Sequence, residues 1–334
     1  MKIAVDAMGG DLGPQEIVKG VIEVLKEYDV SILLVGKKEI LSNILSNYNY
    51  DRNRLEILNA DEEIVMTDSP LAALRQKKNS SIAIGLDAVK KGDARCFVST
   101  SNTGVVMVAA TIKLKLIKGI ERAGIVTVLS NAKKSVTILM DVGASVDSKP
   151  EHLLHYSIMA SEYAKIILNK SEVTVGLLNV GEEETKGNEL AKDTFVLLKK
   201  CLPNFYGNVE GRDIYKAKTD VVICDGFTGN TILKVSEGLA ETLFDMIREG
   251  IKEKLQYKIG ALLLKPFFKK FKKTISYSEY GGAPLLGVNG YVIICHGRST
   301  YIAIKNAVRV SLNFCKQNVN DSISEKINAL SQFR

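Results

Sequence analysis

The sequence predicts an α/β protein, a three-layer α/β/α sandwich around a mostly parallel sheet. Short β-branched runs alternate along the chain with longer segments in which apolar residues recur at helical spacing. The short runs are almost continuously apolar, which is typical of strands that helices cover on both faces. A chain of 334 residues with 46% hydrophobic and 25% charged residues can bury such a core.

The strands and helices can be placed in order along the chain. Nine runs are expected to be strands, at residues 2–7, 30–35, 55–58, 96–99, 125–129, 136–142, 173–180, 221–224 and 291–295. The clearest helices are expected at residues 14–28, 151–168, 188–200 and 299–318. Pro14 suits the first turn of a helix, and the apolar residues that follow it repeat at helical spacing.

One long segment interrupts this alternation. Residues 227–273 carry no strand signal and show a helical pattern over most of their length. No Pro-rich or Gly/Ser-rich linker separates them from the rest. We therefore expect a single α/β catalytic domain over residues 1–334, with residues 227–273 as a helical protrusion that projects from the sheet.

The positive charge of the chain is concentrated in the second part of this segment. The formal net charge is +7, and residues 252–273 contain eight lysines and one acid, Glu253. Leucines and phenylalanines interleave with these lysines, as in helices that lie on anionic membranes. The alternative is a solvated basic face whose apolar side chains pack against a partner subunit. Nucleic acid is not expected as a partner, because no helix-turn-helix, zinc-finger or RNA-binding signature accompanies the charge.

Composition also indicates where the protein works. Asp6 interrupts the apolar stretch near the N-terminus, so we expect no secretory signal, and no stretch is long enough for a transmembrane helix. The five cysteines show no CxxC spacing, which favours a reducing cytoplasm and a role as small hydrophobic residues.

Polar turns follow the predicted strands. In a doubly wound sheet, ligands bind beyond the carboxyl ends of the strands, where glycines and helix N-termini can hold a phosphate. The chain has six such turns, at residues 6–11, 99–104, 141–150, 181–188, 225–230 and 296–299. Together they predict a crevice that handles anions.

Several other kinds of site are disfavoured. The chain has no GxGxxG, GxxxxGK[ST] or GxSxG motif, which argues against NAD, ATP and esterase chemistry. His152 and His155 lack HExxH spacing, so packing or capping is expected rather than metal binding. The turns also contain aspartates that could bind a divalent ion, or could equally cap helices: Asp6, Asp11, Asp141, Asp147 and Asp225.

Two residues are candidates for the chemistry itself. Lys186 is the only lysine in a glycine-bounded turn with three glutamates, where it could position phosphate or stabilise an oxyanion. A surface ion pair with one of those glutamates is the simpler interpretation. Asn230 lies near the start of the long helical segment, where it could donate an amide to a carbonyl oxygen or cap the helix.

The turns together resemble a known family. The motifs that carry the resemblance are DAMGGD (6–11), SNTG (101–104), LMDVGASVDSKPEHL (139–153), NVGEEETKGNEL (179–190), DGFTGN (225–230) and GGAPLLGVNG (281–290), followed by HG (296–297). This set is similar to that of the PlsX-type phosphate acyltransferases, in the same order and over essentially the whole chain.

The resemblance implies a reaction and an assembly. It implies transfer of a fatty acyl group from acyl-acyl carrier protein to inorganic phosphate, giving acyl phosphate for phospholipid synthesis, without a cofactor or metal. The implied fold is that of the isocitrate and isopropylmalate dehydrogenases and phosphate acetyltransferases. The implied assembly is a cytoplasmic homodimer in peripheral contact with an anionic membrane, the carrier protein and possibly a downstream acyltransferase.

The resemblance also assigns residues. Lys186 and Asn230 match the proposed catalytic pair of the family. Residues of the other turns are expected to bind phosphate or substrate: Asp6, Gly9, Gly10, Ser101, Asn102, Thr103, Gly104, Asp141, Lys149 and His296. The protrusion is expected to contact the membrane or a partner through Lys265, Phe267, Phe268, Lys269, Lys270 and Phe271.

The chain departs from the common family pattern at two turns. Thr100 and Ser101 replace an Ala-Gly pair, and Arg298 stands where relatives often have Ser. These changes affect the expected geometry of the phosphate pocket. Three rival functions remain from the sequence: a phosphate acetyl- or butyryltransferase that uses coenzyme A, a metal-dependent decarboxylating dehydrogenase, and a non-catalytic membrane scaffold.

Overall fold

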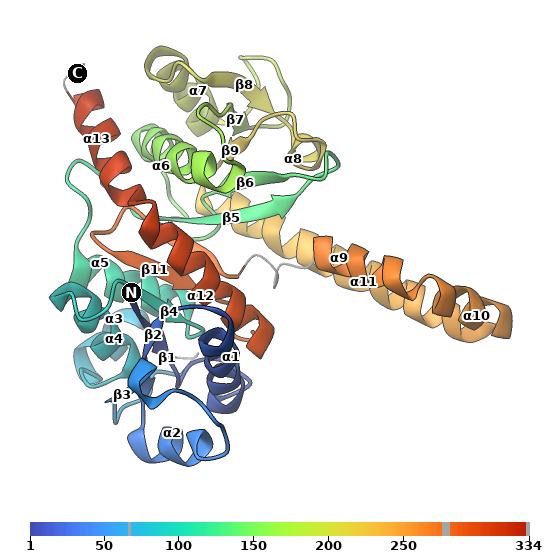
Figure 1. Ribbon diagram of the computed structural model, residues 1–334. Coiled ribbons are helices and arrows are strands. Elements are labelled where there is room, and N and C mark those ends of the chain that lie inside the picture. The colour runs from blue at the N-terminus through green and yellow to red at the C-terminus, as the bar shows by residue number, and fades with distance from the viewer. Residues whose placement is uncertain (66–67, 276–280, 332–334) are drawn as a thin grey trace.

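A computed structural model describes residues 1–65, 68–275 and 281–331 (Figure 1). Its centre is an 11-stranded sheet with the order β3-β2-β1-β4-β11-β10-β5-β6-β9-β7-β8. The strands are β1 (Lys2–Asp6), β2 (Ser31–Gly36), β3 (Leu55–Asn59), β4 (Cys96–Ser99), β5 (Gly124–Ser130), β6 (Val136–Met140), β7 (Val175–Leu178), β8 (Phe205–Val209), β9 (Val221–Ile223), β10 (Ala283–Leu286) and β11 (Tyr291–Ile294).

The sheet consists of two parallel sets joined by antiparallel strands. Strands β3, β2, β1, β4 and β11 are parallel to one another, and so are β6, β9, β7 and β8. β10 is antiparallel to both β11 and β5, and β5 is antiparallel to β6. The predicted mostly parallel sheet is therefore confirmed. The two sets run in opposite directions, so their carboxyl ends lie at opposite edges of the sheet.

Helices cover both faces, which confirms the three layers. Alternate residues of one strand enter different cores: Ile3 and Val5 of β1 belong to one core and Ala4 to the other. The first core is covered by α1 (Pro14–Glu27), α2 (Lys38–Leu45), α6 (Pro150–Leu168), α7 (Glu189–Cys201), α12 (Tyr301–Lys316) and α13 (Val319–Ser331). The second is covered by α3 (Pro70–Gln76), α4 (Ser81–Lys91), α5 (Thr103–Leu114) and α8 (Gly211–Lys216), and a short 3₁₀ helix spans Arg52–Arg54.

The predicted elements agree with the structure within a few residues. All nine predicted strands are present, although those expected at 136–142 and 173–180 end earlier, where the polar turns begin. The four clearest helices correspond to α1, α6, α7 and α12. In α1 the buried side chains include Ile17, Val18, Val21, Ile22 and Leu25. These are the residues whose spacing predicted the helix.

Two strands, β8 and β10, were not predicted. β8 is an edge strand that contains Gly207. β10 contains Pro284 and follows two glycines, Gly281 and Gly282, that both have positive φ. Proline cannot donate to a ladder and therefore argues against a central strand. Pro284 is paired with Ile293 of β11, whereas the pairs with β5 involve only Leu285 and Leu286.

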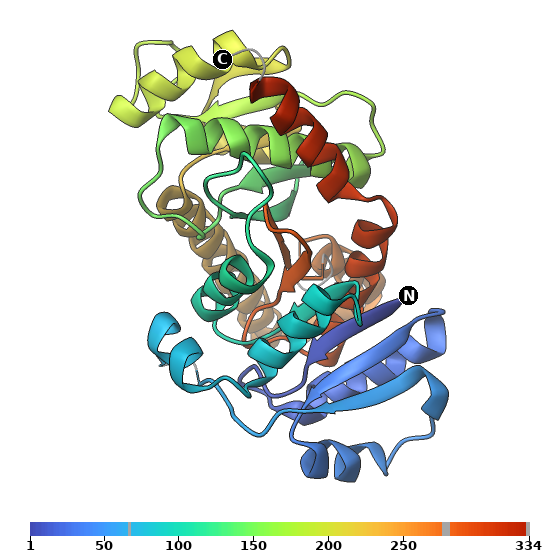
Figure 2. The same cartoon turned by 90° about the vertical axis from the view of Figure 1, so that its left-hand side faces the viewer.

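The predicted protrusion is confirmed. The long helix α9 (Gly226–Glu253) leaves the sheet and is followed by α10 (Leu255–Leu263) and α11 (Lys265–Ile275), which returns alongside it (Figure 1). At 1.5 Å per residue, α9 is about 42 Å long. Figure 2 shows the molecule turned by 90° about the vertical axis, so that the protrusion lies behind the body. In the described part of the chain, no helix is both long and apolar enough to cross a membrane.

Candidate active site

The first group of predicted site residues lies where β1, β4 and β11 end. Asp6 is buried, and its Oδ2 accepts hydrogen bonds from Ser99 Oγ at 2.7 Å and Ser101 Oγ at 2.6 Å. Its Oδ1 accepts from the Met8 backbone N–H at 3.1 Å, and the Ser101 N–H donates to Ser99 Oγ at 3.1 Å. The carboxylate of Asp6 thus connects the turn after β1 to the turn after β4.

Glycines allow these two turns to approach each other. A Cβ at Gly9 would lie 2.7 Å from the Ser101 backbone nitrogen. Gly10 has φ 84, and a Cβ there would lie 2.9 Å from Thr100 Oγ1 and 3.0 Å from the Gly297 carbonyl oxygen. The Asp11 N–H donates to that same carbonyl oxygen at 2.7 Å. No side chain other than hydrogen fits at either glycine without moving its neighbours.

The N-terminus of α5 completes this group. Asn102 caps the helix by accepting from the Val105 N–H at 3.2 Å, and Thr103 and Gly104 are its first residues. The first N–H groups of a helix have no intrahelical acceptor and carry partial positive charge, which favours an anion. His296 is exposed, and its Nδ1 accepts from the Arg298 N–H at 3.1 Å. This bond makes Nε2 the nitrogen that carries the proton in neutral His296.

The second group begins at Asp141, just after β6. Its buried carboxylate accepts from the backbone N–H groups of Ile125 at 2.9 Å, Gly143 at 3.2 Å, Ala144 at 3.0 Å and Ser145 at 2.8 Å. Burial raises the pKa of Asp141 to about 6, although these hydrogen bonds oppose the shift. The carboxylate holds the turn of residues 141–145 in place.

The start of α9 packs on this turn. Asp225 caps α9 by accepting from the Thr228 N–H at 2.9 Å, and the Gly226 N–H donates to the Ser145 carbonyl oxygen at 2.9 Å. Asn230 is exposed and does not cap the helix; its Cγ would lie 3.6 Å from a Cβ at Gly143. The amide of Asn230 therefore lies beside the glycine of the preceding turn.

Lys186 lies in the turn after β7 and is exposed. Glu182 pairs with Lys218 at 2.6 Å, and Glu184 pairs with Lys199 at 2.7 Å. Lys186 forms no ion pair with any residue that the structure describes. The simpler interpretation of Lys186, an ion pair with a neighbouring glutamate, is wrong. Its backbone is held instead, because its carbonyl oxygen accepts from Asn179 Nδ2 at 3.0 Å.

Lys149 and His152 stand at the start of α6. Lys149 is exposed, and its backbone N–H donates to His152 Nδ1 at 3.1 Å. His152 is buried, with Nε2 3.3 Å from Glu121, and burial lowers its pKa while Glu121 opposes the shift. The capping and packing role predicted for His152 is confirmed.

The six turns do not all lie together. The turns after β6, β9 and β7 share one edge, because these strands are neighbours and parallel. They bring Asp141, Lys149, Asn230 and Lys186 to that edge. The turns after β1, β4 and β11 lie at the opposite edge. The prediction that all six turns form one crevice is therefore corrected: within one chain the turns form two groups, one at each edge of the sheet.

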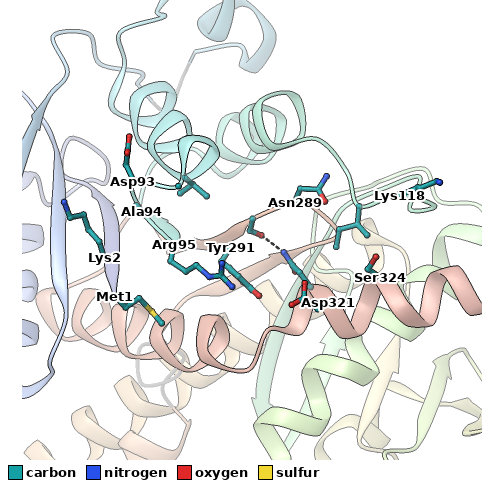
Figure 3. A pocket seen from close by; sticks show the side chains of 15 residues that line it. Met1, Lys2, Asp93, Ala94, Arg95, Lys118, Asn289, Tyr291, Asp321 and Ser324 are labelled. Carbon is teal, nitrogen blue, oxygen red and sulfur yellow. Dashed lines mark hydrogen bonds between the residues drawn. The ribbon is translucent and has the colours of Figure 1, made fainter.

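A cavity of about 720 Å³ lies elsewhere along the sheet, and Figure 3 shows the side chains that line it. It is at the amino ends of β1, β4 and β11, and its lining includes Lys2, Arg95, Lys118 and Asp321. The Arg95 guanidinium lies 5.4 Å from the centre of the Tyr291 ring and donates to Asn318 at 2.9 Å. None of the predicted site residues lines this cavity.

The comparison with known proteins now identifies the family. The model of the family described as fatty acid synthesis protein matches residues 1–322. A protein of Dictyoglomus turgidum is 46% identical over 332 residues, 99% of each chain, and one of Fusobacterium nucleatum is 47% identical over 320 residues, 95% of this chain and 96% of the relative. Both are named phosphate acyltransferase. The chain belongs to the family of these phosphate acyltransferases. It is an acyltransferase of lipid biosynthesis.

Solved structures support the fold of this acyltransferase. A phosphotransacetylase of Streptococcus pyogenes matches with a TM-score of 0.64 and 17% identity, over 95% of this chain and 94% of the other. A 4-hydroxythreonine-4-phosphate dehydrogenase of Klebsiella pneumoniae matches with 0.53 and 11%, over 94% and 99%. The architecture is thus shared by transacylases and dehydrogenases, as expected.

Some residues of this acyltransferase site were not predicted. Ser99 holds Asp6 as closely as Ser101 does, and Gly226 and Gly229 allow α9 to approach Asp141. A Cβ at Gly229 would overlap the Asp141 carbonyl oxygen. The spacing of the glycines in DGFTGN was the available signal, but both glycines contact Asp141, which is more than 80 residues earlier in the chain.

Proposed function

We propose that this acyltransferase moves a fatty acyl group from acyl-acyl carrier protein to inorganic phosphate and so makes acyl phosphate for phospholipid synthesis. The observation that supports this most is the placement of Lys186 and Asn230. Both are exposed, both follow parallel strands at one edge, and Lys186 has no carboxylate partner within the described residues. A cation and an amide donor are the groups that an acyl transfer to phosphate requires.

In the proposed step, a phosphate oxygen attacks the thioester carbonyl carbon directly. The new C–O bond forms, the C–S bond breaks, and the sulfur leaves as a thiolate that takes up a proton. Lys186 orients the phosphate and offsets its charge, while the Asn230 amide donates a hydrogen bond to the developing oxyanion. No covalent enzyme intermediate is needed, because a thioester is already activated, and the step uses no cofactor.

We propose that phosphate binds at the N-terminus of α5. Backbone and side-chain donors of Ser101, Asn102, Thr103 and Gly104 would hold it, with His296 Nε2 nearby at the same edge. Asp6 and Asp141 would act through the turns that they hold, because their carboxylates already accept hydrogen bonds from the protein. Gly9 and Gly10 would keep the turn after β1 close to Ser101.

Lys186→Ala is the test of the reaction. We expect the rate of acyl phosphate formation from acyl-acyl carrier protein and phosphate to fall by about a hundredfold or more, since one charge-stabilising group is lost. Lys192→Ala, an exposed lysine on α7, is the matched control. Near-normal turnover of Lys186→Ala would contradict the assignment. Faster turnover of coenzyme A thioesters than of carrier-protein thioesters by the unsubstituted protein would favour the rival acetyl- or butyryltransferase.

We also propose that the protein is a homodimer. Five strand-to-strand steps separate β11 from β7 in the sheet, which places Lys186 about 24 Å across the sheet from the first group. A second copy can place its Lys186 beside the proposed phosphate site at the N-terminus of α5 in the first copy. The exposed apolar residues on α9, Val235, Leu239, Leu243 and Met246, offer a surface for such pairing.

The protrusion is proposed to bring the cytoplasmic enzyme to an anionic membrane. α11 carries Lys265, Lys269 and Lys270 together with three phenylalanines. Phe267 and Phe271 are exposed, with stacked rings 5.9 Å apart. The basic helix also suits the acidic carrier protein and a downstream acyltransferase as partners.

A further inference from the structure

Three exposed apolar side chains lie around the proposed catalytic pair. Val146, Val180 and Phe227 are 63%, 80% and 64% exposed. One comes from each of the turns that follow β6, β7 and β9. Most apolar side chains of the α/β body are buried. Three exposed apolar side chains at one edge therefore indicate a surface that binds an apolar ligand or partner.

The backbone contacts place these three residues at the same edge of the sheet. The hydrogen bond from the Gly226 N–H to the Ser145 carbonyl oxygen places Val146 and Phe227, the next residues in the chain, on either side of it. Leu177 of β7 is paired with Ile223 of β9. Val180 therefore lies level with the start of α9, three residues beyond that pair.

Phe227 also lies close to the proposed oxyanion donor. It precedes Asn230 by three residues in the first turn of α9, and residues at this spacing share a helix face with Cβ atoms about 5–6 Å apart. A group that contacts Phe227 can therefore reach a carbonyl held by Asn230.

The charges at this edge fit the same ligand. Glu182 and Glu184 are engaged by Lys218 and Lys199, and Lys186 has no ion pair among the residues described. The edge thus presents the ammonium groups of Lys186 and Lys149, the carboxylate of Glu183, the amide of Asn230 and an apolar surface. A ligand that matches it has a polar or anionic oxygen at the end of an alkyl chain.

We propose that Val146, Val180 and Phe227 bind the first methylenes of the acyl chain and set the preference of the enzyme for long over short chains. This inference rests on the proposed acyl transfer and adds the acyl subsite to it. An alkyl chain gains from removing its own surface and that of the three side chains from water, in proportion to the area buried. A short acyl group cannot bury the same area.

Phe227→Ser and the double variant Val146→Ser/Val180→Ser test the proposal. kcat/KM is measured with butyryl, octanoyl and palmitoyl thioesters of the carrier protein. We expect the palmitoyl-to-butyryl ratio to fall by about tenfold or more in each variant, with the KM for phosphate unchanged. Val196→Ser on α7, 68% exposed and away from this edge, is the matched control and should keep the ratio. Thermal unfolding of each variant verifies that it folds.

The outcomes separate the two proposals. An equal loss for all chain lengths, or an unchanged ratio in an active variant, would overturn the acyl subsite and leave acyl transfer standing. Loss of the dimer in Phe227→Ser with an unchanged ratio would assign the surface to a second copy instead. An unsubstituted protein that transfers none of these acyl groups to phosphate would overturn both.

Discussion

Asp141 is a buried carboxylate in the turn beside Asn230, the proposed oxyanion donor. It holds the turn that supports Asn230, and its pKa is raised to about 6 from the usual 3.8. Between these two values the folded protein binds a proton that the unfolded chain does not. This group therefore disfavours folding above pH 6, and that cost disappears as the pH falls.

Asp141→Asn removes this titration. As the pH falls from 7 to 5, we expect the free energy of unfolding of the unsubstituted protein to increase by about 1 kcal/mol relative to the variant. Denaturant unfolding of both proteins at pH 5, 6 and 7 measures the difference. Parallel pH profiles would show that Asp141 does not titrate in this range.

At the scale of elements, the proposed membrane contact and the proposed chemistry lie on different parts of the molecule. Phe271 lies 6.0 Å from Phe244 of α9, ring centre to ring centre, which ties α11 to the long helix. In the proposed membrane contact, each lysine of α11 near the anionic surface would contribute about 1 kcal/mol. The turns to which we assign the chemistry follow strands of the sheet, in the body of the molecule (Figure 1).

Replacing Phe267, Phe268 and Phe271 with serine tests this separation. We expect co-sedimentation with anionic vesicles to fall severalfold, because apolar insertion is lost, while turnover of soluble substrate persists. Leu71→Ser on α3, another exposed apolar residue, is the control. Unchanged sedimentation of the triple variant would remove α11 from the membrane contact.

At the scale of the whole molecule, the two groups of proposed site residues lie at opposite edges of the sheet, although the proposed reaction requires both. The antiparallel strands β10 and β5 reverse the direction of the second parallel set. The first group, where we propose that phosphate binds, and Lys186 of the same copy therefore lie at opposite edges of the sheet. A dimer resolves this if each copy supplies one half of the site.

Mixed dimers test this arrangement. Thr103→Glu places a carboxylate at the N-terminus of α5, where it is compatible with the helix but repels phosphate. We expect it to be inactive, as Lys186→Ala should be. Co-refolded mixtures of the two variants should recover about a quarter of normal activity if the site is shared between copies. Folded mixtures that stay inactive would place both groups in one copy.

The sequence alone determined much of the layout. Apolar runs and helical spacing are local signals, and they located nine strands, the main helices and the protrusion. The turns that hold Lys186 and Asn230 were found because glycines and polar residues after a strand mark the carboxyl end of that strand. The single catalytic domain proposed from the sequence remains a prediction.

The tertiary structure decided what depends on distant partners. Pairing direction at β10 and β5 divided the turns between two edges, and no local pattern records that direction. Glu182 pairs with Lys218 and Glu184 pairs with Lys199, so neither glutamate pairs with Lys186. Asp6 connects the turn after β1 to the turn after β4, because Ser99 and Ser101 donate hydrogen bonds to its carboxylate. Strand pairing, ion pairing and burial join residues that are distant in the sequence, so only the folded chain fixes them.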